Sequence, residues 1–445
     1  MFDIKLFPKS ALKIIKELNE KGFAGYFVGG CVRDLLLGAK PHEWDLATDA
    51  APQEVAAIFS KVVPTGVEFG TVTVILGEGK YEVTTFRSDE RYKDGRHPTK
   101  VNFTRDIHLD LSRRDFTVNA MAYEPFKKEL IDDFSGRRDI AKSTIRAVGK
   151  AKERFLEDGL RSIRACRFAA QLNFKIEAGT FKAISTTLKV TKKVAFERIH
   201  DELVKLLMGS DKPSVAFEYM RRSGLLKLIM PELLKTYKIK QPRQYHKYDV
   251  YWHSLHAMDA APRSSLVLRL AALLHDIAKP RCKKGHTFYN HDLLGAKIAE
   301  KTLRRLKFSN EVVDRVCLLI KNHMFYYTSE WTDAAVRRFI RRVGLANIPD
   351  LFAVRKIDKI AMETEIGDDE YLDELRKRID RVVADQNALH IKDLKINGRD
   401  VMKTLKIAPG PKVGKVLGAL LERVLDEPAR NDRKILLEMV KEYAD

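Results

Sequence analysis

The sequence predicts an α+β head followed by a remainder that is almost entirely helical. Within the first 135 residues, short β-branched runs alternate with turn residues, as in the strands of a small mixed sheet. From about residue 137 onward, apolar residues instead recur at the spacing of buried helix faces. The chain has 445 residues, about three times the length of an average domain, so more than one hydrophobic core is expected.

The elements of the head follow from these two periodicities. Helices and strands are expected in the following places: a helix at about 8–21, a second helix from about residue 31, and strands at 26–28, 70–76 and 81–86. Glycine and proline residues mark three candidate domain boundaries, at 136–137, 240–247 and 407–415.

Charge and cysteine usage narrow the class of protein. Lys plus Arg exceed Asp plus Glu by 81 − 61 = 20, so the chain attracts polyanions, and nucleic acid is the first partner to consider beside a generally solvated basic surface. The four cysteines form no CxxC pair, which indicates a reducing compartment without a disulfide framework or zinc knuckle. No run approaches the roughly 18 apolar residues of a membrane span, so we expect a cytoplasmic protein with no membrane partner.

A double glycine, Gly29-Gly30, separates an apolar strand from a predicted helix that contains Arg33. Glycines at such a turn let backbone N–H groups approach phosphate oxygens, and the helix N-terminus and the arginine add positive potential. The same residues also fit a plain turn, so this motif alone leaves both interpretations open.

Two acidic residues that follow are spaced two apart, as on one side of a strand. Glu43 and Asp45 would lie on one side of a strand, where they repel unless they share a cation. Glu82 lies within the alternating run 81–86, where a charge on the buried side of a strand needs a partner such as a metal. Solvated acids on an edge strand are the alternative.

Four motifs occur in a fixed order: GGCVRD at 29–34, EWDLAT at 43–48, RDFTVNA at 114–120 and RFLEDGLRSIRACRFAA at 154–170. Together they resemble the bacterial-type (class II) tRNA nucleotidyltransferase and poly(A) polymerase family. The resemblance implies a polymerase-β-like head in which Mg²⁺ is held by Glu43 and Asp45, with Glu82 as a further catalytic acid. Glu43 departs from the Asp that the family usually has, which leaves altered metal geometry or reduced activity open while retaining the charge.

The resemblance also assigns nucleotide-binding residues, namely Gly29, Gly30, Arg33, Arg113, Arg114, Asp115, Asn119, Asp158, Arg161, Arg164 and Arg167. The segment 154–170 is similar to the family's nucleotide-selecting helix. Within it, Asp158 and Arg161 would act as a protein template for the base edge of CTP or ATP, and their spacing predicts one shared helical face. The polar segment 87–100 resembles the loop that relatives need for adding A.

A second set of residues lies in the helical part, where His275 and Asp276 are adjacent in a predicted apolar helix. Histidines and aspartates suit divalent transition metals, although a single such histidine is usually structural. Their order resembles the HD metal-dependent phosphohydrolase domain, whose ligand places are matched by His253, His275, Asp276, His291, His323 and Asp358. His256 remains an alternative to His253. The resemblance implies an Mn²⁺, Fe²⁺, Co²⁺ or Ni²⁺ site that hydrolyses phosphomonoesters or cyclic phosphates.

The tail segments 396–402, 407–417 and 427–431 resemble the C-terminal region of HD-containing CCA-adding enzymes. We therefore expect a nucleotidyltransferase head at 1–136, a neck and body at 137–240, an HD domain at 241–365 and a tRNA-binding tail at 366–445. The expected activity is addition of CCA, or of the terminal A, to tRNA from CTP and ATP, with an added HD phosphohydrolase activity. A poly(A) polymerase, or a tRNA-binding HD phosphohydrolase with a disabled head, are the alternatives.

Overall fold

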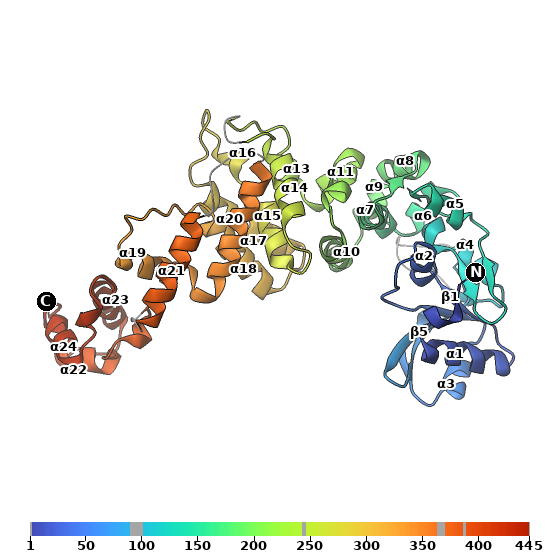
Figure 1. Cartoon of the computed structure of the whole chain (residues 1–445), viewed down its shortest axis with the longest axis horizontal. Helices are drawn as coiled ribbons and strands as arrows, with labels where there is room; N and C mark the ends of the chain where they lie inside the picture. The colour runs from blue at the N-terminus through green and yellow to red at the C-terminus, as the bar shows by residue number, and fades with distance from the viewer. Residues whose placement is uncertain (1, 90–100, 243–245, 363–369, 386–388, 445) are drawn as a thin grey trace. The chain divides into compact units, whose positions relative to one another are not determined.

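The structure is a computed structural model that describes residues 2–89, 101–242, 246–362, 370–385 and 389–444 (Figure 1). The chain forms two compact units. Unit 1 comprises Met1–Leu234 and Arg305–Phe308, and unit 2 comprises Lys235–Arg304 and Ser309–Asp445.

A seven-stranded mixed sheet forms the centre of the head in unit 1, in the strand order β3-β4-β5-β2-β1-β8-β9. Its strands are β1 (Gly25–Val28), β2 (Leu46–Thr48), β3 (Val62–Gly66), β4 (Thr71–Leu76), β5 (Gly79–Thr85), β8 (Ala122–Glu124) and β9 (Glu129–Ile131). β2 and β5 run parallel, whereas the other neighbouring pairs are antiparallel. The predicted α+β head is therefore confirmed.

Helices α1 (Lys9–Glu20) and α3 (Pro52–Ile58) pack on this sheet (Figure 1). α1 forms an amphipathic helix because Ala11, Ile14, Ile15 and Leu18 recur at helical spacing, and all four are buried in the head core. This packing holds β1 in place and thereby fixes the position of the glycine turn that follows Val28.

The rest of unit 1 is mainly helical. Its helices are α2 (Gly30–Leu36), α4 (Ile107–Ser112), α5 (Gly136–Ala141), α6 (Ala151–Glu157), α7 (Leu160–Leu172), α8 (Ala178–Thr186), α9 (Leu188–Thr191), α10 (Phe196–Gly209), α11 (Ser214–Ser223), α12 (Leu225–Ile229) and α13 (Pro231–Leu234). Two short strand pairs join them, β6 (Arg87–Asp89) with β7 (Val101–Phe103), and β10 (Thr144–Ile145) with β11 (Lys175–Ile176). α7 packs against α10 and α11.

Two local predictions were wrong. Glu43 and Asp45 do not lie on a strand, because β2 begins only at Leu46. The expected continuous helix over 154–170 is interrupted between α6 and α7. At the break, a Cβ on Gly159 would come within 2.7 Å of the backbone of Thr191, so close backbone packing separates the two helices.

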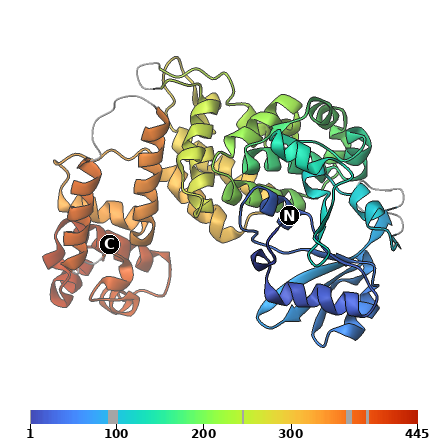
Figure 2. The same ribbon diagram turned by 45° about the vertical axis from the view of Figure 1, so that its right-hand side comes forward.

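Unit 2 is built from helices. They are α14 (Val250–Ala260), α15 (Leu266–Leu274), α16 (Lys279–Cys282), α17 (His291–Arg305), α18 (Asn310–Asn322), α19 (Asp333–Val343), α20 (Ile348–Met362), α21 (Glu370–Ala384), α22 (Gly398–Leu405), α23 (Pro411–Asp426) and α24 (Arg433–Lys441). α14, α15 and α20 pack against one another, and α15 and α20 also contact α18. The red helices in Figure 2, α22 to α24, enclose a small core of their own around Leu420, Leu421 and Leu436.

In the part of the chain that the structure describes, no helix combines the length and apolar character needed to cross a membrane.

Candidate functional site

The glycine turn of the head lies where β1 meets α2. Gly29 has a φ of +73°, a left-handed conformation that favours glycine. A Cβ at this position would lie 3.1 Å from Nη1 of Arg114 and 3.8 Å from Oδ2 of Asp45. The missing side chain therefore leaves a cradle between an arginine and a carboxylate.

The three acids predicted in the head gather near this cradle. Asp45 is half-buried, whereas Glu43 and Glu82 are exposed. Burial raises the pKa of Asp45 to about 6; the nearby charges of Glu82 and Glu43 add to the increase, and Arg114 opposes it. The predicted burial of Glu82 was wrong, because in β5 the alternate residues Tyr81 and Val83 face the core and Glu82 faces solvent.

Arginines and an amide surround the cradle. Arg33 Nη1 donates to Oδ1 of Asn119 at 2.6 Å, and its Nε donates to Asp34 at 2.9 Å. The Arg33 side chain therefore lies beside the glycine turn at a fixed angle. Arg114 Nη2 donates to Oδ2 of Asp110 at 3.1 Å.

A second arginine shares the same acid. Arg113 donates through Nε and Nη2 to Oδ1 of Asp110, at 2.9 and 2.6 Å. Burial alone would raise the pKa of Asp110, but Arg114 and Arg113 hold it below its ordinary value. Asp110 thus stays ionised and fixes two adjacent arginines by charge-assisted hydrogen bonds.

The buried carboxylate of Asp115 links the head to the helices. Its Oδ2 accepts from Nε and Nη2 of Arg164, at 2.8 and 2.6 Å, and its Oδ1 accepts from Asn119 at 3.4 Å. Arg164 and Arg161 hold the pKa of Asp115 below its ordinary value although burial opposes them. The predicted residues of the RDFTVNA motif and of α7 are therefore connected through one acid.

The network continues along α7 to Glu202 of α10. Oε2 of Glu202 accepts from Nε of Arg167 at 2.6 Å, and Arg164 Nη1 lies 3.4 Å from Oε1. The guanidinium groups of Arg33, Arg164 and Arg167 also lie within 5.5 Å of the ring centroid of Phe168. Three guanidiniums, each also paired with a carboxylate, therefore form a wall around one ring.

Asp158 and Arg161 do not share a helical face, which corrects the prediction. Asp158 follows the end of α6 with an extended backbone, and its Oδ1 accepts from the N–H of Leu160. Its carboxylate is also bound by Arg198, at 3.1 and 2.7 Å. Arg161 instead donates to Glu157 at 2.7 Å and to the carbonyl oxygen of Arg113.

Several partners in unit 1 were missed by sequence reasoning, namely Asp34, Asp110, Glu157, Arg198 and Glu202. Glu202 could have been found, because it is a charged residue on the apolar face that Ile199, Leu203 and Leu206 define in α10. Arg198 carries no comparable signal. Most of the predicted loop at 87–100 lies outside the described residues.

The second predicted set of residues comes together in unit 2. Two buried groups each offer three ligand atoms within 4.8 Å of one another: His253, His275 and Asp358 in one, and Asp276, His291 and His323 in the other. The Nε2 atoms of His253 and His275 lie 3.1 Å apart, and those of His291 and His323 lie 3.3 Å apart.

Asp276, a member of the second group, also contacts the first. Its Oδ2 is 3.3 Å from Nε2 of His275, and its Oδ1 is 3.4 Å from Nε2 of His291. A carboxylate with one oxygen toward each group is suited to bridging two cations.

All four histidines present the same ring nitrogen to the cluster. Their Nδ1 atoms lie near backbone carbonyl oxygens: 3.4 Å from Ala361 for His253, 2.8 Å from Ala272 for His275, 2.7 Å from Phe288 for His291, and 2.7 Å from Ile320 for His323. A proton on Nδ1 satisfies each carbonyl and leaves Nε2 as an acceptor, which is the arrangement of metal-binding histidines.

The charges in the metal-free cluster are mixed. Burial would lower the pKa of His275, but Asp276 and Asp358 raise it to about 10, so a cation bound here would displace a proton from that ring. Burial opposes ionisation of Asp276, but His275 and Lys279 beside it hold its pKa well below the ordinary range. Burial lowers the pKa of His323 to about 4, so this imidazole is neutral at pH 7. Lys279 Nζ lies 2.6 Å from Asp276 Oδ2 and donates to Gln241.

The positions of these residues differ in detail from the prediction. His275 and Asp276 do not lie inside an apolar helix; α15 ends at Leu274 and they form the turn that follows. His253 lies in the cluster, whereas His256 contacts Tyr248 and Trp252.

Three sequence families match separate parts of the chain. The Poly A polymerase head domain matches residues 25–146, the "Probable RNA and SrmB- binding site of polymerase A" matches 173–236, and "tRNA nucleotidyltransferase domain 2 putative" matches 291–440.

Curated relatives match the chain over nearly its whole length. The CCA-adding enzyme of Ligilactobacillus salivarius is 35% identical over 98% of this chain and 97% of its own. That of Enterococcus faecalis is 31% identical over 97% of this chain and 95% of its own.

Solved structures agree in fold. The Bacillus stearothermophilus CCA-adding enzyme in complex with CTP has a TM-score of 0.67 at 29% identity, covering 99% of this chain and 98% of the other. The Thermotoga maritima CCA-adding enzyme complexed with tRNA_CCA has a TM-score of 0.56 at 23% identity, with 99% and 96% covered, and its likeness concerns the fold alone.

Proposed function

This chain belongs to the family of CCA-adding enzymes, which are tRNA nucleotidyltransferases, and we propose that the cradle beside Gly29 is where its nucleotide is added to tRNA. CCA addition takes CTP and ATP as nucleotide sources and the tRNA 3′ end as acceptor. Full-length relatives named as CCA-adding enzymes favour this activity over poly(A) synthesis.

The observation that carries the proposal is the meeting of three carboxylates and two arginines at a glycine turn. Oxygen donors of Asp45, Glu43 and Glu82 fit a hard cation such as Mg²⁺, with Asp45 as its firmest ligand. Bound there, Mg²⁺ would neutralise triphosphate charge as the primer oxygen attacks. Arg33 and Arg114 would orient the triphosphate, because both guanidiniums are fixed by neighbouring acceptors.

Base selection in this proposal falls to Asp158 and Arg161. A carboxylate only accepts and a guanidinium only donates, so together they fit the edge of C or A and leave G and U poorly paired. The wall of Arg33, Arg164 and Arg167 around Phe168 would hold the remaining phosphates. Arg113 and Asp115 would not touch the nucleotide but would position other side chains, because Arg113 is paired with Asp110 and Asp115 is paired with Arg164.

We also propose that the six-residue cluster of unit 2 binds divalent transition metals and hydrolyses phosphomonoesters or cyclic phosphates. Four imidazoles and two carboxylates are the donor set that Mn²⁺, Fe²⁺, Co²⁺ and Ni²⁺ prefer. Metal there would supply Lewis-acid activation of the phosphoester. Asp276 and the carbonyl-anchored histidines would set the geometry, and Lys279 would add positive charge for an anionic substrate.

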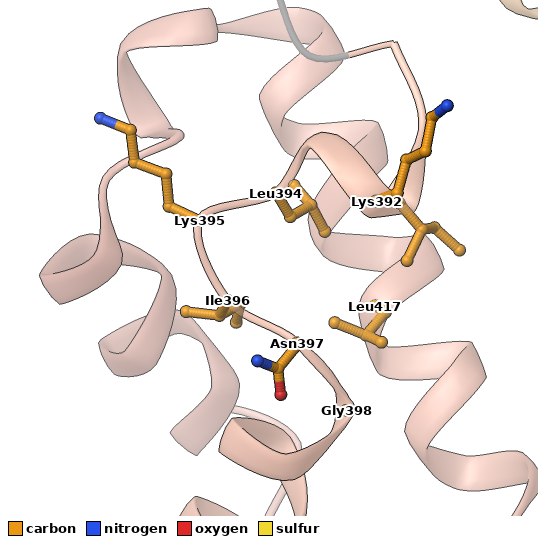
Figure 3. A pocket seen from close by; sticks show the side chains of 8 residues that line it. Lys392, Leu394, Lys395, Ile396, Asn397, Gly398 and Leu417 are labelled. Carbon is orange, nitrogen blue, oxygen red and sulfur yellow. The ribbon is translucent and has the colours of Figure 1, made fainter.

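The tail, proposed at 366–445, would bind tRNA through phosphate contacts. Lys392 and Lys395 line a cavity of about 350 Å³ beside Leu394 and Leu417. In Figure 3 the two lysine side chains extend away from these apolar residues in different directions. This exposes both ammonium groups to a polyanion. The other proposed boundaries are a head at 1–136, a neck and body at 137–240 and an HD domain at 241–365.

One experiment separates the candidate activities. The purified protein is incubated with tRNA lacking CCA and with labelled CTP and ATP, separately and together. Growth that stops once CCA is complete supports CCA addition, and incorporation of only the last nucleotide on tRNA ending in CC indicates A addition. Unlimited growth with ATP indicates a poly(A) polymerase, and no growth with Mg²⁺ or Mn²⁺ indicates a disabled head.

A further inference from the structure

Two exposed tyrosines lie within three residues of histidines of the cluster in unit 2. Tyr289 and Tyr326 are 77% and 78% exposed, more than any other large hydrophobic side chain among the described residues. Tyr289 lies two residues before His291, and Tyr326 lies three residues after His323. A chain advances at most about 3.6 Å per residue, so both tyrosines lie close to the cluster.

The exposure of Tyr326 is imposed by its neighbours. Phe325 and Tyr327 are buried on either side of it. The ring of Phe325 lies 5.8 Å from that of Phe352, and the Tyr327 hydroxyl donates to Glu374 at 2.7 Å. Because both flanking side chains are anchored, the Tyr326 ring is held out toward solvent.

The backbone around Tyr289 is also fixed by the cluster. The carbonyl oxygen of Phe288, the preceding residue, lies 2.7 Å from Nδ1 of His291. Asn290, the following residue, has a φ of +60°. This left-handed residue turns the chain between Tyr289 and the ligand histidine.

The surroundings are basic. Lys284, His286 and Lys321 are exposed close to the two tyrosines in sequence, and Lys279 lies in the cluster itself. Exposed aromatic rings beside positive charges are how proteins hold bases of single-stranded nucleic acid without reading their sequence.

We propose that Tyr289 and Tyr326 are specificity residues that stack on the base of a nucleoside phosphoester hydrolysed at the cluster. The substrate class is then a nucleotide or an RNA end carrying a ribose phosphate or cyclic phosphate. In the reaction, an oxygen of water bonds to phosphorus, one phosphorus–oxygen bond to ribose breaks, and that ribose oxygen takes a proton. This inference rests on the hydrolase activity proposed above.

The test compares two esters that differ only in the base, adenosine 2′,3′-cyclic phosphate and methyl riboside 2′,3′-cyclic phosphate, with the full chain loaded with Mn²⁺, Co²⁺ or Ni²⁺. We expect Tyr289→Ala and Tyr326→Ala each to lower kcat/KM for the adenosine ester about tenfold, mainly through KM, and to leave the base-free ester unchanged. Tyr→Phe variants at both positions should retain the parent values. Phe126→Ala, which removes an exposed ring from the head, is the matched control.

A binding measurement accompanies the kinetics. Fluorescence of 2-aminopurine riboside 2′-phosphate, with excess CTP added to occupy the head, should be quenched on binding to the parent and not to the double alanine variant. If an alanine variant melts early, Tyr→Leu replaces it. An RNA oligomer ending in a cyclic phosphate, compared with the mononucleotide, shows whether the physiological source is an RNA end.

The outcomes are distinct. If the tyrosine variants keep the preference for the adenosine ester and the quenching, the stacking role is overturned while the hydrolase activity stands. If the parent hydrolyses neither ester with any of these metals, the proposed hydrolase function is overturned, and the specificity role falls with it.

Discussion

Arg198 donates two hydrogen bonds to the carboxylate of Asp158, from Nη1 at 3.1 Å and from Nη2 at 2.7 Å. Such a bidentate pair fixes the plane of the carboxylate as well as its position. Since Asp158 is the proposed template for the incoming base, Arg198 of α10 determines how that template is presented.

Replacing Arg198 with Ala should therefore weaken nucleotide selection, as Asp158→Ala should. We expect the preference for CTP and ATP over UTP and GTP to fall by about tenfold or more, equivalent to about 1–3 kcal/mol for unmatched polar groups. Single-nucleotide incorporation with each triphosphate measures this. Arg221→Ala, which breaks a comparable bidentate pair with Glu218 on α11, should leave selection intact. Unchanged selection in Arg198→Ala together with loss in Asp158→Ala would mean that Asp158 needs no such support.

Glu43→Asp should keep or raise nucleotide addition with Mg²⁺. Shortening the side chain by one methylene restores the residue usual in the family, and Mg²⁺ tolerates little departure from octahedral geometry. Addition rates across Mg²⁺ and Mn²⁺ concentrations measure the effect, with Asp45→Ala as a reference that we expect to be inactive and still to bind tRNA. Complete loss of activity in Glu43→Asp would show that the site has been rebuilt around glutamate.

Asp45 should destabilise the metal-free protein at neutral pH. Its folded pKa of about 6 is above the ordinary value of 3.8, so between these values the folded state binds more protons than the unfolded state. The contribution of Asp45 to the free energy of unfolding therefore falls as pH rises from about 4 to 6 and stays low above that.

Asp45→Asn should accordingly raise the free energy of unfolding at pH 7.5 by about 1–3 kcal/mol in chelator. The gain should disappear below about pH 4, where the parent carboxyl is protonated. Denaturant titrations at several pH values measure it. Added Mg²⁺ should stabilise the parent and not the variant. If Asp45→Asn raised the free energy of unfolding equally at every pH, the ionisation of Asp45 would not be the cause.

Replacing both His275 and Asp276 with Ala should eliminate phosphohydrolase activity and leave CCA addition within a few-fold. The two proposed sites use different ligands and lie in different units of the chain. A thermal melt accompanies the assay, because the remaining ligands become buried polar groups without their partners. Loss of CCA addition in a normally melting variant would show that the HD residues take part in tRNA handling.

Binding of tRNA should weaken steeply as the salt concentration rises. The logarithm of the binding constant should fall with the logarithm of the salt concentration, with a slope of about −0.7 to −0.9 for each neutralised phosphate. Lys392→Ala and Lys395→Ala should each reduce this slope by about one contact. Lys13→Ala, on an exposed face of α1, should not change it. Fluorescence anisotropy over a KCl series gives the slopes, and a flat response in the parent would exclude phosphate contacts as the basis of binding.

Residue patterns predicted the elements better than the contacts. The apolar spacing of Ile14, Ile15 and Leu18 was sufficient for α1, because burial alone decides that helix. The break at Gly159 could not be foreseen, because its cause is the distant backbone of Thr191. Glu82 was expected on the buried side of its strand, although apolar residues alternate along β5 in a way that places Glu82 among the solvent-facing residues.

The two candidate sites also differ in how far the sequence predicted their contacts. The six histidine and aspartate residues that resemble the ligand set of an HD domain do come together in unit 2, and their role as metal ligands stays a prediction. In the head, motif order led to Asp158 and Arg161, yet not to their partners. The role of Arg198 arises only from tertiary contact, whereas Glu157 lies four residues before Arg161, a spacing that the sequence does offer.

The carbonyl-anchored histidines have a consequence for rigidity. Nδ1 of each ring faces a backbone carbonyl oxygen, so a cation bound by the Nε2 atoms and the two carboxylates would hold α14, α17, α18, α20 and the turn after α15 together. The ion would then act as a removable cross-link between segments far apart in sequence. Because it is released when the chain unfolds, it would stabilise unit 2 by binding only the folded state. Metal supply would thereby govern how often these helices open, measurable as slower hydrogen exchange in unit 2 when the metal is bound.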